Sequence, residues 1–153
     1  SAKSFADTHL FPKLGITDFT WDQDAYGISN GGFGLSLRIR DMLKFGQLFL
    51  QKGKSAGQEI ISSSWINKST TMLIPFDASQ TRGYGYLWWT AKVNGVNIYN
   101  ALGYAGQFII VVPSKALVIA ATSNSVPVDG YVNDLYDNIM DKIVSSFSAI
   151  NDK

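Results

Sequence analysis

Several residue types that commonly carry the chemistry of a protein are absent or rare in this sequence. There is no cysteine, which excludes disulfide bonds and thiolate sites and fits either a reducing or an extracytoplasmic compartment. Histidine and glutamate occur once each, as His9 and Glu59. We expect neither a metal ion nor an organic cofactor.

Strong net charge and long apolar runs are also lacking. The formal net charge of +1 at pH 7 gives no electrostatic reason to expect a nucleic acid or an acidic membrane as partner. No apolar run approaches the ~20 residues of a membrane span, and the first residues lack the pattern of a signal peptide. Hydrophobic residues make up 46% of the 153 positions, which argues against disorder and suits one domain with a sizeable core.

The apolar residues concentrate between positions 102 and 121. A glycine-containing stretch, LGYAGQF at 102–108, continues into IIVV at 109–112. After the turn at 113–115, a second apolar run covers 116–121, and both runs are typical of strands buried on two faces. Upstream, residues 84–93 and 96–101 are predicted strands joined by Asn94-Gly95, the strongest hairpin signal in the chain. The sequence therefore predicts a four-stranded, mostly antiparallel meander.

A helix is predicted to begin after an N-cap at Ser36 and to be stopped by Gly53. Apolar residues recur at helical spacing at Leu35, Ile39, Leu43 and Leu50. The charged residues are expected mainly on the solvated sides: Arg38, Arg40, Asp41 and Lys44.

Three further helices are predicted. One covers residues 4–11 and is ended by Pro12, and a short one follows a cap at Ser62 or Ser63. The clearest covers residues 131–147, where one continuous apolar stripe should pack on the sheet. Residues 16–34 are loop-like in composition, and a loop of that length is unusual unless it is functional.

This loop holds two formal motif matches. Residues 22–27 imitate the start of a calcium loop, but Tyr26 and Phe33 replace oxygen ligands. Residues 27–31 match Gly-x-Ser-x-Gly with Ser29 as nucleophile, yet no apolar strand precedes the motif and His9 lies upstream. A glycine-rich turn is the simpler interpretation of both. Similarly, Ser64 and Lys68 could share a helix face, although two solvated side chains are the simpler alternative.

The order of five motifs resembles the C-terminal half of the serine β-lactamase-related family, which includes class C β-lactamases, DD-peptidases and esterases. The motifs are LGITD at 14–18, GGFGLS at 31–36, RDMLKFGQ at 40–47, YGYLWW at 84–89 and GYAGQF at 103–108. The resemblance implies an α+β fold, in which an antiparallel sheet has the C-terminal helix on one face and helices on the other. It also implies a serine hydrolase that acts through an acyl-enzyme, and suggests a periplasmic or extracellular location.

The family's nucleophile motif is missing. Ser-x-x-Lys occurs nowhere, and Tyr-x-Asn occurs only at 131–133 and 136–138, in the wrong order along the chain. We therefore expect residues 1–153 to be the C-terminal portion of one β-lactamase-like domain, with the nucleophile and base in a segment upstream. An incomplete sheet should expose an apolar face and an unpaired strand edge.

The third motif of the family corresponds to Tyr104-Ala105-Gly106. By resemblance, the backbone N–H of Gln107 is an oxyanion-hole donor, and Gly106 lets the substrate approach the strand. Tyr104 replaces the usual cation with a neutral phenol, which favours an ester or small amide at least as much as a penicillin. Ala105 and Trp88 are expected to contact the substrate. Since Trp88 and Trp89 alternate in direction, one could line the cleft, or both could belong to the core.

Three functions remain open at this point. The leading one is a piece of a serine hydrolase acting on a β-lactam, a D-Ala peptide or a small ester. The second is a non-catalytic homologue that binds cell-wall material or peptides. The third is an unrelated hydrolase that uses Ser29.

Overall fold

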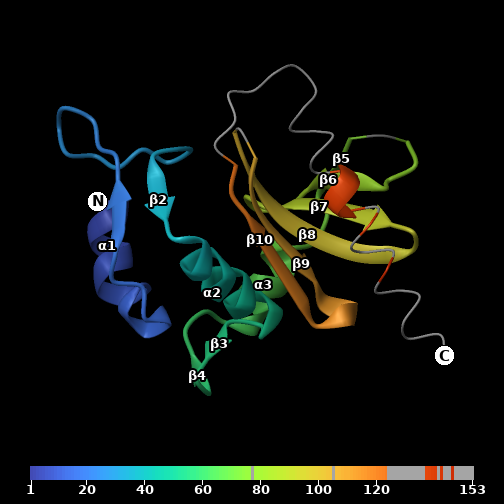
Figure 1. Cartoon of the computed structure of the whole chain (residues 1–153), viewed down its shortest axis with the longest axis horizontal. Coiled ribbons are helices and arrows are strands. Elements are labelled where there is room, and N and C mark those ends of the chain that lie inside the picture. The colour runs from blue at the N-terminus through green and yellow to red at the C-terminus, as the bar shows by residue number, and fades with distance from the viewer. Residues whose placement is uncertain (77, 105, 124–136, 141, 143–145, 147–153) are drawn as a thin grey trace.

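The computed structural model describes residues 1–76, 78–104, 106–123, 137–140, 142 and 146 (Figure 1). In chain order its elements are α1 (Ala2–His9), the 3₁₀ turn η1 (Pro12–Leu14), β1 (Phe19–Trp21), β2 (Leu35–Leu37), α2 (Ile39–Leu50), β3 (Lys54–Ser55), β4 (Gln58–Glu59), α3 (Ser63–Ser69), β5 (Ile74–Pro75), β6 (Arg82–Tyr84), β7 (Trp89–Val93), β8 (Val96–Gly103), β9 (Gln107–Val112), the 3₁₀ turn η2 (Pro113–Lys115) and β10 (Leu117–Ala121). No helix among these described elements is both long and apolar enough to cross a membrane.

The main sheet has six antiparallel strands in the order β10-β9-β8-β7-β6-β5. Its four longer strands are the predicted meander, and the short strands β5 and β6 extend it at one edge. The fold is therefore α+β, as predicted. Figure 1 shows α2 beside the sheet, with α1, β1 and β2 on the far side of α2.

The turn between β7 and β8 confirms the hairpin prediction. Val93 pairs with Val96, so the loop consists of Asn94 and Gly95 alone. Both loop residues have positive φ, 49° and 83°, as a type I′ turn requires.

Residues 84–93 do not form the single strand that the sequence predicts. β6 ends at Tyr84, and the loop closes where the Gly85 N–H donates to the Trp88 carbonyl at 2.8 Å. A Cβ on Gly85 would lie 2.3 Å from the Ser69 carbonyl oxygen, so only glycine allows this approach to α3. The close contact explains why a run rich in β-formers is interrupted.

Helix α2 begins later than predicted. Ser36 lies in β2 opposite Thr20 rather than at a cap, and Arg38 occupies the N-cap position without a side-chain hydrogen bond. At the other end, the Gly53 N–H donates to the Leu48 carbonyl at 2.8 Å and the Lys52 N–H to Phe49 at 3.0 Å. These two bonds form a Schellman motif, which confirms the predicted stop at Gly53.

Asp41 is buried, contrary to the expectation that it is solvated. The Lys44 ammonium donates to its carboxylate at 2.7 Å and to the Gly15 carbonyl at 2.6 Å. The partner explains how a charged side chain is accommodated inside the fold.

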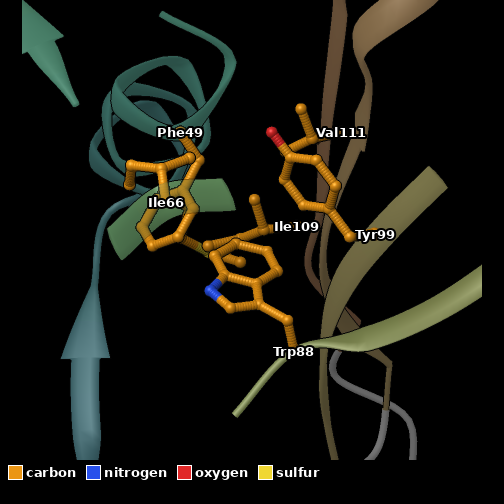
Figure 2. Close-up of a cluster of buried hydrophobic side chains, with 7 residues drawn as sticks. Phe49, Ile66, Trp88, Tyr99, Ile109 and Val111 are labelled. Atoms are coloured by element: carbon orange, nitrogen blue, oxygen red, sulfur yellow. The ribbon is translucent and has the colours of Figure 1, made fainter. Parts of the chain in front are cut away.

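Two apolar clusters cover the two faces of the sheet. Because side chains alternate along a strand, β9 contributes to both, which confirms that it is buried on two faces. The cluster on the α2 face contains Met42, Phe49, Ile66, Trp88, Tyr99, Ile109 and Val111 (Figure 2). The cluster on the opposite face contains Ile98, Phe108, Ile110, Val112 and Met140.

Met140 lies within the predicted helix 131–147 and is 2% exposed. Its contact with the sheet agrees with the predicted packing. Most of that helix, including residues 131–136, lies outside the described residues.

A third cluster joins the N-terminal elements to α2. It contains Ala6, Phe11, Leu14, Ile16 and Leu48. The predicted loop 16–34 is partly structured, since Phe19–Trp21 forms β1 and pairs with β2. The strand was missed because its three residues are too short for a periodicity signal.

Candidate active site

The predicted site surrounds the hairpin between β8 and β9. Gly103 pairs with Gln107, so the loop has three residues, and Gly106 adopts a φ of 91° that favours glycine. Tyr104 is 83% exposed at the tip, with its phenol open to solvent. Ala105 lies outside the described residues. Tyr104 and Gly106 thus lie in this loop, and Gln107 is the first residue of β9.

The direction of each amide in β8 follows from the register. In an antiparallel sheet, a residue turns both its N–H and its C=O to one neighbouring strand, and the next residue turns them to the other. Val93 and Val96 close a two-residue turn, so they form a hydrogen-bonded pair. The pairs Ala91–Ile98 and Trp89–Asn100, two and four residues further from the turn, are hydrogen-bonded in the same way. The Lys92 N–H agrees with this pattern, because it donates away from β8, to the Thr81 carbonyl at 2.7 Å.

This pattern turns the polar backbone groups of Gly103 towards β9, where Gln107 lies opposite. The Gln107 backbone is correspondingly turned towards β8, and its side-chain Nε2 donates to the Ser123 carbonyl at 3.1 Å. Sheet pairing of this kind counts against a backbone N–H of Gln107 that is free to donate to a substrate. Its role as an oxyanion donor stays a prediction.

By the same pattern, the N–H of Leu102 has no partner in β7. β7 begins at Trp89, which pairs with Asn100, so no residue of β7 lies opposite Leu102. The N–H of Leu102 is turned to this side of β8, while Ala101 and Gly103 on either side pair with β9. The sequence does not single out Leu102, because a strand over the whole of residues 84–93 would cover this edge of β8.

The two tryptophans occupy different environments. Trp88 is 4% exposed and packs against Phe49 with ring centroids 4.4 Å apart, so it belongs to the core and not to an open cleft wall. This burial corrects the expectation that Trp88 contacts the substrate. Trp89 is 39% exposed and contacts Phe76 edge-on at 5.3 Å.

A hollow of about 430 Å³ lies beside Trp89 and the exposed part of β8. Phe76, Trp89 and Leu102 give it an apolar wall, and Arg82 and Asp137 add a charge pair with 3.6 Å between nitrogen and oxygen. Its size is within the range of small-molecule sites. The Leu102 side chain lines this hollow, so its amide and the hollow belong to one region of the surface.

The alternative motifs do not form reactive sites. The Ser29 hydroxyl accepts the Lys3 N–H at 3.1 Å within the β1–β2 loop, without the strand-to-helix turn of a nucleophile elbow. The Asp24 carboxylate accepts the Tyr26 and Ile28 N–H groups, both at 2.9 Å. In the part of the chain that the structure describes, no group of three metal-binding side chains comes together.

Ser64 and Lys68 also lack a shared site. The Ser64 hydroxyl lies 3.1 Å from that of Ser62, whereas the Lys68 ammonium lies over the Tyr86 ring, 5.4 Å from its centroid. The simpler alternative, two separate surface side chains, agrees with these contacts.

Comparison with known proteins adds a family and a fold. A family model described as Beta-lactamase matches residues 1–142. The solved structure "Putative 6-aminohexanoate-dimer hydrolase from Bacillus anthracis" is similar at a TM-score of 0.79 and 22% identity, over 96% of this chain and 38% of that chain. A second, "Crystal structure of putative beta-lactamase from Bacteroides dorei DSM 17855", is similar at a TM-score of 0.58 and 12% identity, over 89% of this chain and 50% of that one. A search of curated proteins gave no match.

Proposed function

Because this chain belongs to the beta-lactamase family, we propose that it forms the sheet side of the catalytic cleft of a serine hydrolase. The substrate is an amide or ester, such as a β-lactam, a D-Ala peptide or a small ester, and the reaction passes through an acyl-enzyme. The serine and its base belong to another segment of the protein, since this sequence contains no Ser-x-x-Lys. The chain spans 38% and 50% of the two solved relatives, which leaves room for such a segment.

The observation that carries the proposal is the open edge of β8 at Leu102. An acyl-transfer site needs a rigid N–H directed at the oxygen that becomes negative. Leu102 lies opposite Phe108 of β9, between Ala101 and Gly103, and this pairing holds its peptide in place. Among the described residues, β7 has none opposite Leu102, so in this proposal its N–H is available. In this proposal the Leu102 amide is the donor, and the Gln107 amide is the alternative suggested by resemblance.

The surroundings of Leu102 favour an apolar, uncharged substrate group. Trp89 and Phe76 give the neighbouring hollow an aromatic wall that suits an acyl chain or ring. Tyr104, exposed at the tip of the same hairpin, supplies a hydroxyl donor in place of a cation. A small ester or a linear amide therefore fits better than a penicillin carboxylate.

The edge of the main sheet at β10 is consistent with a further segment that carries the serine. β10 is the last strand of the described sheet, and its five residues are all half-buried. On α2, Ile39 and Leu43 are 44% and 37% exposed. A strand or helix from the segment that carries the serine would cover this apolar edge.

The test compares this chain alone with the protein that contains it together with its preceding segment. A fluorophosphonate probe and p-nitrophenyl butyrate serve as reagents. We expect labelling and ester hydrolysis only with the longer protein, at a serine outside residues 1–153. Absence of both from the folded longer protein would favour the non-catalytic binding homologue, and labelling of the short chain at Ser29 would support the unrelated hydrolase.

The role of Leu102 is tested in the same longer protein. Leu102→Pro removes the N–H, and we expect kcat to fall about 10²–10³-fold, as for loss of one oxyanion donor. Leu102→Ala keeps the N–H and is the matched control, expected within about tenfold of the parent. Equal activity of the two variants would reject the Leu102 amide as a donor.

A further inference from the structure

A larger cavity lies at the other end of β8, away from the hairpin tip at Tyr104. Its volume is about 740 Å³, and it lies between the C-terminal end of α2, α3, the β7–β8 hairpin and η2. Figure 1 shows α2 and α3 beside the main sheet. The proposed catalytic cleft does not use this cavity.

The floor of the cavity is a patch of hydrogen-bond donors on neighbouring strands. Thr90 pairs with Tyr99, and Lys92 pairs with Asn97, so these four side chains lie on one face of the sheet. Thr90 is 6% exposed, and its hydroxyl has no hydrogen-bond partner among the described residues. Such a buried hydroxyl gains free energy when a ligand supplies an acceptor.

The charge of the cavity has one sign. Lys52, Lys92 and Lys115 line it, and none of the residues that line it is an aspartate or a glutamate. The ion pairs formed between described residues involve other cations, namely Arg38, Lys44 and Arg82. The electrostatic field in the cavity therefore favours an anion.

The remaining walls are apolar. Phe49, Leu50, Ile66 and Met72 face the same space, and Figure 2 shows Phe49 and Ile66 across from Tyr99. Burial raises the pKa of the Tyr99 phenol to about 12, so it remains a neutral donor at ordinary pH. A ligand that fills the cavity needs both an anionic group and an apolar body.

We infer that this cavity is a binding site for a small organic carboxylate with a short apolar chain. The carboxylate lies over Thr90 and Lys92, with Lys52 and Lys115 at the rim, and the chain lies against Phe49 and Ile66. The site is separate from the cleft at Leu102, so its occupation does not require that the proposed hydrolase activity exist.

Octanoate is the probe, titrated into the 153-residue chain by calorimetry and by amide chemical shifts. We expect saturable binding with a Kd in the millimolar range, typical of a ligand with about ten heavy atoms. Octanol, which has the same chain without the charge, should bind at least about fivefold more weakly. The largest shifts should occur at Thr90, Lys92 and Tyr99.

Three variants distinguish binding in the cavity from nonspecific attraction of octanoate to surface lysines. Lys92→Gln and Thr90→Val should each weaken octanoate binding, by about three- to tenfold, because the first removes a positive charge and the second removes a hydroxyl donor from the floor. Lys13→Gln removes an exposed lysine of η1 and should leave the Kd unchanged. Non-saturable binding, equal binding of octanol, equal effects of K92Q and K13Q, or shifts confined to Trp89 and Leu102 would each overturn the inference.

Discussion

The rings of Trp88 and Phe49 lie with centroids 4.4 Å apart, and this contact joins α2 to the sheet. Trp88 also meets Tyr99 edge-on at 5.3 Å and stacks on Phe45 at 6.4 Å, so three aromatic partners surround one indole. Figure 2 shows Trp88 and Phe49 within the same buried cluster. The stability of the helix–sheet packing should therefore depend strongly on Trp88.

Trp88→Ala should lower the free energy of unfolding by about 3–5 kcal/mol, because it leaves a large cavity among these rings. Trp89→Ala is the matched control, since Trp89 is 39% exposed and should cost less than half as much. Urea unfolding followed by circular dichroism measures both values. Equal losses would show that Trp88 is not the core residue of the pair.

Gly46→Ala should destabilise the protein, although alanine ordinarily favours a helix over glycine by about 1 kcal/mol. A Cβ at position 46 would lie 2.5 Å from Val118 Cγ1 and 2.9 Å from Ile109 Cγ2. We expect a net loss of about 1–3 kcal/mol from overpacking, measured by urea unfolding. Gln47→Ala, at the exposed neighbouring position of α2, should change stability by less than about 0.5 kcal/mol.

Proline substitution tests the direction of the amides in β8 independently of any activity. Leu102→Pro should reduce the free energy of unfolding only modestly, because the Leu102 N–H has no partner in β7 to lose. Ala101→Pro should cost about 3 kcal/mol or more, because the Ala101 N–H is turned to β9. The reverse order of the two losses in thermal unfolding would mean that the register argument is incorrect.

Stability should fall at alkaline pH through Tyr99. Its pKa is raised by burial to about 12, against about 10 in the unfolded chain. The unfolded state therefore loses its proton first, so this contribution is fully present below pH ~10 and is lost as the pH rises towards ~12. Tyr99→Phe should show a shallower decline in this range, by at most about 1.4 kcal/mol per pH unit. Identical slopes for the two proteins would rule out a shifted Tyr99.

The sequence predicted best where short-range chemistry decides the structure. Asn94-Gly95 needs no tertiary context to form its turn, and residues 109–112 are apolar enough to require burial on both faces. The helix α2 was found by its period, but its start was misplaced because Ser36 serves a strand. A good capping residue does not cap when its backbone is already paired.

The sequence does not point to Leu102, because its proposed role depends on where neighbouring strands end. The Gly85 backbone contact with Ser69 interrupts the strand predicted over residues 84–93, and this break uncovers Leu102. The residues around Leu102 in the sequence indicate neither the strand break at Gly85 nor the uncovered edge. The resemblance to a family directed attention to Gln107, five residues further on, whose partner is fixed by the β8–β9 register.

Helix α2 is shared between two cores, since Leu48 packs with the N-terminal elements and its neighbour Phe49 packs against the sheet. The Lys44 ammonium, on the same helix, also donates a hydrogen bond to the Gly15 carbonyl. Neither half of the molecule can open without exposing one side of this helix. The amide hydrogens of α2 should therefore exchange with deuterium among the slowest in the chain, at a rate set by unfolding of the whole domain.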